Sequence, residues 1–240
     1  STITLQISWD YSVVSNGIRT GAFTDSSFFI GYWYPQIAVY DDYMGWDLGS
    51  YTGGQEMYND LANYNVELTL PSNYVVWATG DLLNASNIFS ENILKKIEAS
   101  RKSNEITKII TPEDYKQKII KQPGSVVWNF SAQNVPDFAF AASSYYLWEA
   151  CAAMNDVKTG KTVWVNSIYP PDAAQFKNAI KFAKTSIEYF SSTFTGVPYP
   201  YDKHYSYNGH RRVGMEFPMM ANNLDHTDEN YIFEITAHEI

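Results

Sequence analysis

Between Asn65 and Pro71 the chain reads Val66-Glu67-Leu68-Thr69-Leu70, an alternation of apolar and polar side chains that decides the fold class. A period of two places the apolar side chains on one face, so this run predicts a half-buried β-strand. The same alternation recurs in Thr2-Ile3-Thr4-Leu5-Gln6-Ile7-Ser8-Trp9 and in Thr162-Val163-Trp164-Val165. Short runs of this kind, broken by Gly, Asn, Asp and Pro, are typical of an antiparallel sheet protein.

A helical pattern replaces the strand pattern after Tyr169. Asp172 follows two prolines and is placed as an N-cap, the position whose side chain bonds the first free N–H groups of a helix. The apolar residues that follow are spaced by three and four, as on one face of a helix. They are Phe176, Ile180, Ala183, Ile187 and Phe190. We expect this amphipathic helix to open a second domain.

Four further stretches have predictable structures. The segment from Ser90 to Gln122 is rich in Lys, Glu and Ile, and we interpret it as a polar excursion at a sheet edge. Strand patterns extend over Lys203–Tyr207 and Arg211–Met219. Thr227-Asp228-Glu229 has the residue types that begin a helix, so a last helix is expected from there toward the final residues.

The composition excludes several classes of protein. A chain of 240 residues, 45% hydrophobic, 16% aromatic and 18% charged, is globular and can bury a substantial core. Its net charge of −9 argues against a nucleic-acid partner, because no basic patch is available to neutralise phosphates. No apolar stretch reaches the ~20 residues that a membrane span needs. The compartment is unknown from the sequence, although the content of Tyr, Trp, Asn and Ser favours an extracytoplasmic location, periplasmic or secreted.

Two residue types need an interpretation of their own. Cys151 stands among alanines and is expected to be a small packing residue. The tryptophans are expected to fill the core, with a sugar-binding platform as the alternative. This interpretation concerns six of the seven tryptophans, Trp33, Trp46, Trp77, Trp128, Trp148 and Trp164.

The last three residues, His238-Glu239-Ile240, match the first half of the signature H-E-x-x-H. In the complete signature two His residues four apart face the same way on a helix and hold zinc, while the Glu acts as general base on the metal-bound water. The second His would fall just beyond Ile240, so we expect the chain to be a fragment. The alternative is an ordinary polar pair on a surface helix.

A second motif upstream supports the zinc interpretation. The run Arg212-Val213-Gly214-Met215-Glu216-Phe217-Pro218-Met219-Met220 resembles the Gly-x-Met-Glu-Asn exopeptidase motif of the aminopeptidase N family of zinc metallopeptidases. In that family the metal-binding helix follows this motif after a short interval. The resemblance continues through four other stretches, which together cover most of the chain. They are Trp33-Tyr34-Pro35, Tyr64–Pro71, Val135–Ser143 and Phe194–Tyr201.

The resemblance implies a particular organisation of the chain. Residues 1–170 would be the later part of a β-sandwich N-terminal domain, and residues 171–240 the start of an α+β thermolysin-like catalytic domain. The parent protein would be a zinc-dependent aminopeptidase that removes N-terminal residues from peptides with a free N-terminus. This chain by itself would be inactive and would not hold zinc stably, because it lacks the remaining metal ligands.

The resemblance also implies a role for each site residue. His238 would be the first zinc ligand and Glu239 the general base. Glu216 would bind the α-ammonium group of the substrate, while Gly214 and Met215 would align the peptide through backbone groups. Phe217 departs from the family's common Asn, which leaves the detail of amine recognition open.

Two other functions remain open from the sequence. One is a non-enzymatic β-sandwich module for binding or scaffolding, in which the His-Glu ending is accidental. The other is a catalytically dead relative that binds peptides.

Overall fold

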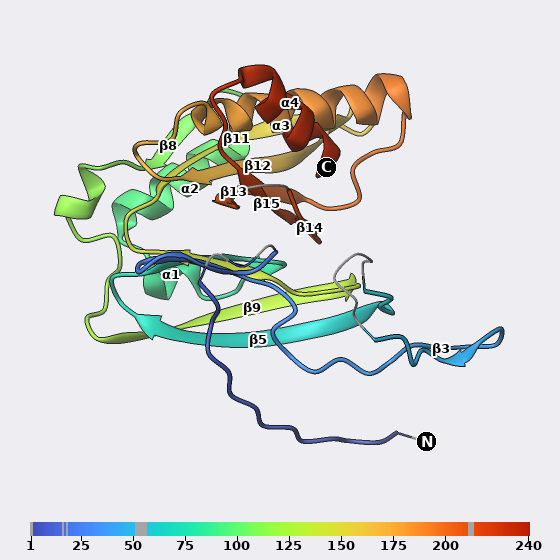
Figure 1. The fold of residues 1–240 in the computed structure, drawn as a ribbon. Helices are drawn as coiled ribbons and strands as arrows, with labels where there is room; N and C mark the ends of the chain where they lie inside the picture. The colour runs from blue at the N-terminus through green and yellow to red at the C-terminus, as the bar shows by residue number, and fades with distance from the viewer. Residues whose placement is uncertain (1, 16, 18, 51–56, 211–213) are drawn as a thin grey trace.

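The computed structural model describes residues 2–15, 17, 19–50, 57–210 and 214–240. The described chain is mainly β, as predicted, and its strands form four sheets (Figure 1). A three-stranded sheet has the order β5 (Ala62–Pro71), β9 (Ser125–Val135), β7 (Asp81–Leu82). A four-stranded sheet has the order β1 (Gly21–Thr24), β2 (Ser27–Ile30), β10 (Phe140–Ser143), β6 (Val75–Ala78). A two-stranded hairpin pairs β3 (Tyr40–Asp41) with β4 (Gly45–Trp46).

The largest sheet has six strands and carries the two long C-terminal helices on one face (Figure 1). Its order is β14 (Glu216–Phe217), β15 (Met220–Leu224), β13 (Lys203–His210), β12 (Lys161–Tyr169), β11 (Leu147–Asp156), β8 (Thr107–Ile110). The α-helices are α1 (Ala85–Ile88), α2 (Glu91–Lys102), α3 (Ala179–Tyr189) and α4 (Glu229–His238). Short 3₁₀ turns cover Asp114–Lys116 and Phe176–Asn178, and a π-helical turn, Phe190–Phe194, extends α3.

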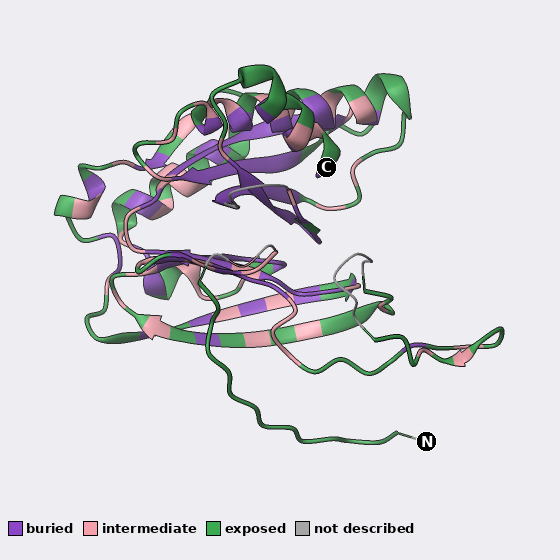
Figure 2. Cartoon of the chain, in the orientation of Figure 1, coloured by how far each residue is buried: buried purple, intermediate pink, exposed green. Residues whose placement is uncertain are grey.

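The alternating stretch Val66–Leu70 lies in β5 and pairs antiparallel with β9, which confirms the strand prediction. Leu68 is opposite Trp128, and both side chains are buried, while Glu67 and Val127 face outward and are exposed. The burial colours of Figure 2 alternate along β5 accordingly. The apolar face of this sheet therefore builds the core shared with the four-stranded sheet.

Both faces of the six-stranded sheet are buried. On one face Cys151 and Val165 pack against Ile180 and Ile187 of α3, and this confirms Cys151 as a packing residue. On the other face Trp148 and other large side chains join the core of the smaller sheets. Strands β12 and β13 are parallel neighbours that lie on either side of residue 170 in the sequence. The predicted domain boundary thus falls between two strands of one sheet, and the division into two folding units stays a prediction.

The strand predicted for residues 2–9 is wrong. The structure has no regular strand there, and Ile3, Leu5 and Ile7 are exposed by 79%, 59% and 53%. The segment is held by Trp9, whose indole N–H donates to the Trp33 carbonyl over 2.8 Å. An alternating pattern makes a strand only where a second strand completes the backbone hydrogen bonds. The described residues place no such strand beside this segment.

The predicted N-cap of the first long helix is also wrong. Asp172 lies in a turn, and α3 begins only at Ala179. The free N–H groups of the preceding turn are instead bonded by Asp225, whose carboxylate accepts from Ala174, Gln175 and Phe176. A partner about fifty residues away in sequence is not visible to a local pattern. The apolar face itself is confirmed, because Ile180 and Ile187 are fully buried.

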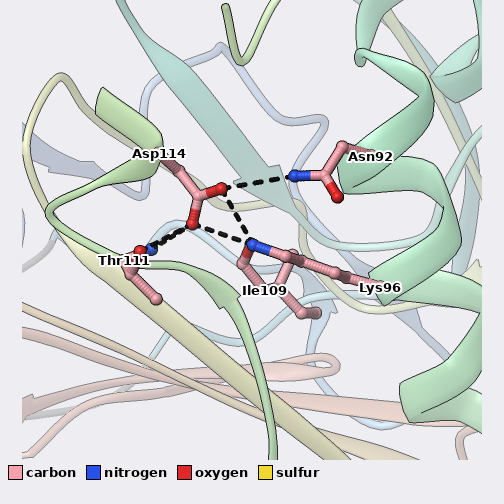
Figure 3. Close-up of polar contacts among 5 residues, drawn as sticks. All are labelled: Asn92, Lys96, Ile109, Thr111 and Asp114. Atoms are coloured by element: carbon pink, nitrogen blue, oxygen red, sulfur yellow. Dashed lines mark hydrogen bonds and ion pairs between the residues drawn. The ribbon is translucent and has the colours of Figure 1, made fainter. Parts of the chain in front are cut away.

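The polar segment Ser90–Gln122 forms the edge predicted for it, since β8 is the last strand of its sheet. The segment is fixed by a partly buried ion pair between Lys96 of α2 and Asp114, with Nζ–Oδ1 at 2.8 Å (Figure 3). Asp114 also accepts from the backbone and the hydroxyl of Thr111 and from the Asn92 amide. These contacts hold α2 against the loop after β8.

Most of the tryptophans fill the core, as predicted. Trp77, Trp128, Trp148 and Trp164 are all at most 5% exposed. Trp33 is partly buried against the same core. Trp46 lies on the hairpin β3–β4, is 56% exposed and contacts Tyr40 edge to face. A buried cluster cannot serve as a sugar-binding platform.

His204 of β13 gives a testable dependence of stability on pH. Burial lowers the pKa of this imidazole to about 4, and its ring nitrogens lie within hydrogen-bond distance of Tyr199 and Ser206. The unfolded chain therefore takes up a proton near pH 6.5, whereas the folded chain does so only near pH 4, so stability falls as the pH drops through this window. Between pH 7 and pH 5 this group should account for a loss of about 2 kcal/mol.

The measurement compares urea unfolding of the wild type and of His204→Gln at both pH values. The variant should lose less stability on acidification than the wild type. Equal losses in both proteins would show that His204 does not control the acid response.

Candidate active site

The hairpin β14–β15 places the central residues of the upstream motif. Met215 exchanges two backbone hydrogen bonds with Asn222, with N–O distances of 3.0 and 2.9 Å. Side chains alternate along the strand, so Met215 and Phe217 are buried and Glu216 is exposed. β14 is the edge strand of the sheet, so no other described strand pairs with its outer edge. The predicted strand Arg211–Met219 is thus confirmed only for Glu216–Phe217, and Arg211–Val213 lie outside the described residues.

A tight turn fixes the geometry of this hairpin. Pro218 and Met219 form the turn, and Met219 has a left-handed backbone with a φ of 67°. A proline followed by a residue of positive φ is the arrangement of a type II turn. The Pro218 carbonyl accepts from the hydroxyl of Thr79, and the Met219 carbonyl accepts from the N–H of Tyr205. The hairpin is therefore bonded to β13 and to the chain after β6.

Phe217, where the family motif commonly has Asn, has a packing role in this chain. Its ring lies 5.5 Å from Phe29 and 5.2 Å from Tyr32 between centroids. A Cβ atom on Gly31 would come within 2.3 Å of the Phe217 ring, so only glycine leaves room for it there. Phe217 thus joins the motif strand to the four-stranded sheet.

The helix predicted to begin at Thr227-Asp228-Glu229 is confirmed, and its C-terminal end places Glu239 beside the chain that leads into β14. Asp228 caps α4 by accepting the N–H of Asn230 over 3.0 Å. The helix ends at His238, and Glu239 follows as its C-cap with only 8% of its surface exposed. Its carboxylate lies against Gly214, since a Cβ on Gly214 would be 1.9 Å from Glu239 Oε1. Two motifs separated in sequence are thus in direct contact.

Met215, Glu216 and Glu239 line one cavity of about 410 Å³. A volume of this order suits a small ligand or one amino-acid side chain. The other lining residues are Tyr32, Met57, Tyr58, Asn59, Pro136, Asp137, Tyr199, Pro200, Tyr201, Phe217, Pro218 and Ile240. A larger cavity of about 620 Å³, lined partly by Tyr115 and Tyr145, contains none of the predicted site residues. The carboxylates therefore single out the smaller cavity as the candidate site.

His238 is exposed on the last turn of α4 and does not line the cavity. Across the described residues no group of three or more His, Cys, Asp or Glu side chains could hold a metal ion. A zinc site with the usual four ligands needs at least three from the protein. The described residues contain no such three-ligand group, and the role of His238 as a zinc ligand stays a prediction.

Several residues of the cavity wall have no predicted role from the sequence. Asp137, Tyr199 and Tyr201 occur in stretches that were quoted only for the family resemblance, and Tyr32 directly precedes another such stretch. Each lies in a loop or next to a strand end, so no local period indicates which way its side chain points. Their place within motif stretches was the only signal that could have suggested a role for them.

Comparison with known proteins supports an aminopeptidase-like fold. No protein-family model and no curated protein sequence matches the chain. Among solved structures, a crystal structure of Legionella pneumophila aminopeptidase A in complex with aspartic acid has a similar fold, with a TM-score of 0.56. The two chains are 14% identical, and the match covers 93% of this chain. The chain spans 23% of the length of that protein. At this identity the comparison shows the fold alone.

No helix among the described residues is long and apolar enough to cross a membrane.

Proposed function

We propose that this chain belongs to a zinc-dependent aminopeptidase related to the aminopeptidase N family, with a thermolysin-like catalytic domain beginning near residue 171. The observation that carries the proposal is the convergence of two motifs, in which Glu216 and Glu239 line one cavity and Glu239 lies against Gly214. The aminopeptidase fold of the structural neighbour supports the same reading.

Glu216 would bind the free α-ammonium group of a peptide. Its exposed carboxylate projects from an edge strand into the cavity, where a charge-assisted hydrogen bond to a cation is strong. This contact would restrict the enzyme to the N-terminal residue, because an internal peptide bond presents no such cation.

The backbone of the same strand would align the substrate by strand addition. Met215 uses both of its backbone groups on Asn222. In an antiparallel pair the neighbouring residues point their N–H and C=O groups to the other side. The peptide would therefore bond to Gly214 and Glu216 at the open edge, while Met215 contributes its side chain to the cavity wall.

Glu239 would act as the general base. Its buried carboxylate is held beside the strand that receives the substrate, which is where a proton must be taken from the attacking water. Zinc, bound by His238 together with ligands outside the described residues, would supply the polarisation that makes this water acidic. Residues 1–240 alone would not retain zinc or activity.

The test uses the full-length protein that contains this chain. We expect about one zinc per molecule by elemental analysis, and cleavage of fluorogenic aminoacyl substrates but not of the same substrates with an acetylated N-terminus. Glu216→Gln should lower kcat/KM by about ten- to a hundredfold, mainly by raising KM, because it removes one charged contact. Without zinc or cleavage, the chain would be part of a binding module or a dead relative.

A further inference from the structure

Asp137 is a buried carboxylate in the wall of the proposed active site, and it has one oxygen without an assigned partner. Only 5% of its surface is exposed, and it lines the cavity with Glu216 and Glu239. Its Oδ1 atom accepts from the Phe138 N–H at 2.6 Å, from the Tyr34 hydroxyl at 2.9 Å and from the Gln36 amide at 3.3 Å. None of these bonds reaches Oδ2.

The contacts around Oδ1 fix the direction of this carboxylate. The Tyr34 hydroxyl lies 2.9 Å from Asp137 Oδ1 and 2.9 Å from the Tyr64 hydroxyl, and it accepts from the Gln36 amide at 2.7 Å. Its single hydrogen is donated to Asp137 or to Tyr64, one at a time. Burial raises the pKa of Asp137, whereas the donors Phe138 and Tyr34 oppose that shift. A carboxylate in such a place is stabilised by a cation, since burial penalises its charge.

The charges of the cavity point to a doubly cationic ligand. Its described lining contains three carboxylates, those of Asp137, Glu216 and Glu239, and no Lys, Arg or His side chain. The proposed function uses Glu216 for the α-ammonium group and Glu239 for the attacking water. The proposed function gives no role to the third carboxylate, that of Asp137. A peptide with an apolar first residue would provide no cation to pair with the charge of Asp137.

The remaining walls suit a long side chain with a terminal charge. Met57 and Met215 offer apolar surface to a methylene stem. The rings of Tyr199 and Tyr201, 5.6 Å apart, belong to the same lining and can face a cation. Because Asp137 Oδ1 already accepts three hydrogen bonds, only Oδ2 remains to accept one from a ligand. A single acceptor atom can bond an ammonium group as well as a guanidinium group.

We propose that Asp137 is a specificity-determining residue that makes the site prefer peptides whose first residue is lysine or arginine. The inference rests on the proposed function for the placing of the α-ammonium group at Glu216. It concerns binding, so it can be tested separately from catalysis.

The experiment is a calorimetric titration of the full-length protein with lysinamide and with norleucinamide, two ligands that differ in the side-chain charge and share the α-ammonium group. The wild type should bind lysinamide about tenfold more tightly, as expected for one charge-assisted hydrogen bond. Asp137→Asn, which keeps the size and the Oδ1 acceptor, should bring the ratio of the two affinities to about one. Glu216→Gln should weaken both ligands and leave the ratio in place.

Two controls separate charge from structure. Asp42→Asn removes an equal charge from an exposed position of the β3–β4 hairpin and should keep the wild-type ratio. Tyr34→Phe removes a hydrogen bond to Asp137 but keeps its charge, so the preference for lysinamide should persist.

Equal affinity of the two ligands in the wild type, or a preference that survives in Asp137→Asn, would overturn the specificity role while leaving amine binding by Glu216 intact. If neither ligand binds, both the specificity role and the proposed function fail.

Discussion

Replacing Glu239 by Gln in the full-length protein should lower kcat for aminoacyl substrates by about 10²- to 10⁴-fold and leave KM within a few-fold of the wild type. The carboxylate is 8% exposed, lines the cavity and lies against Gly214. Glutamine preserves the shape of the side chain but cannot accept a proton from water at neutral pH. The loss should therefore appear in the chemical step, in contrast to Glu216→Gln, whose loss should appear in binding. Steady-state kinetics of both variants distinguish the two roles.

Two other variants sharpen this test. Glu234→Gln changes the same residue type on the exposed surface of α4 and should keep wild-type kinetics. Gly214→Ala adds a methyl group where Glu239 Oε1 would be only 1.9 Å away, so the carboxylate must move and kcat should fall although no ionisable group is lost. Full activity in Glu239→Gln would show that this residue takes no part in the reaction. It would also contradict the interpretation of the His-Glu pair as part of a zinc-peptidase signature.

The sequence predicted those parts of the fold in which one short segment decides its own burial. The alternation at Val66–Leu70 and the apolar face Phe176–Ile187 are both confirmed, because their spacing fixes which side chains share a face. The prediction failed where the outcome depends on a distant partner. The segment from Thr2 to Trp9 alternates equally well but has no neighbouring strand among the described residues, and the cap of the α3 region comes from Asp225.

The same distinction applies to the candidate site. Glu216 and Glu239 were singled out because each stands in a motif that resembles one of the aminopeptidase N family, and the structure brings both to one cavity. Their roles stay predictions. Asp137 was given no role, because its place in the same cavity depends on β14, the end of α4 and the loop after β9, which no local pattern describes. Residues of this kind become visible only when segments more than seventy residues apart are placed together.

The core between the three-stranded and four-stranded sheets should depend strongly on Trp128. We expect Trp128→Ala to lower the free energy of unfolding by about 3–5 kcal/mol, the usual cost of emptying a large aromatic site. The side chain is fully buried opposite Leu68 and contacts the Phe89 ring edge to face at 5.4 Å, so it joins β5, β9 and the chain after α1. Its indole nitrogen has no hydrogen-bond partner among the described residues, so Trp128→Phe loses volume but no hydrogen bond and should cost clearly less than the alanine variant.

Val127→Ala is the matched control, because Val127 is the preceding residue on the outer face and is 43% exposed. Its replacement should change stability by no more than about 0.5 kcal/mol. Urea unfolding of the three variants measures these differences. A Trp128→Ala effect as small as that of Val127→Ala would show that this core does not depend on the Trp128 side chain.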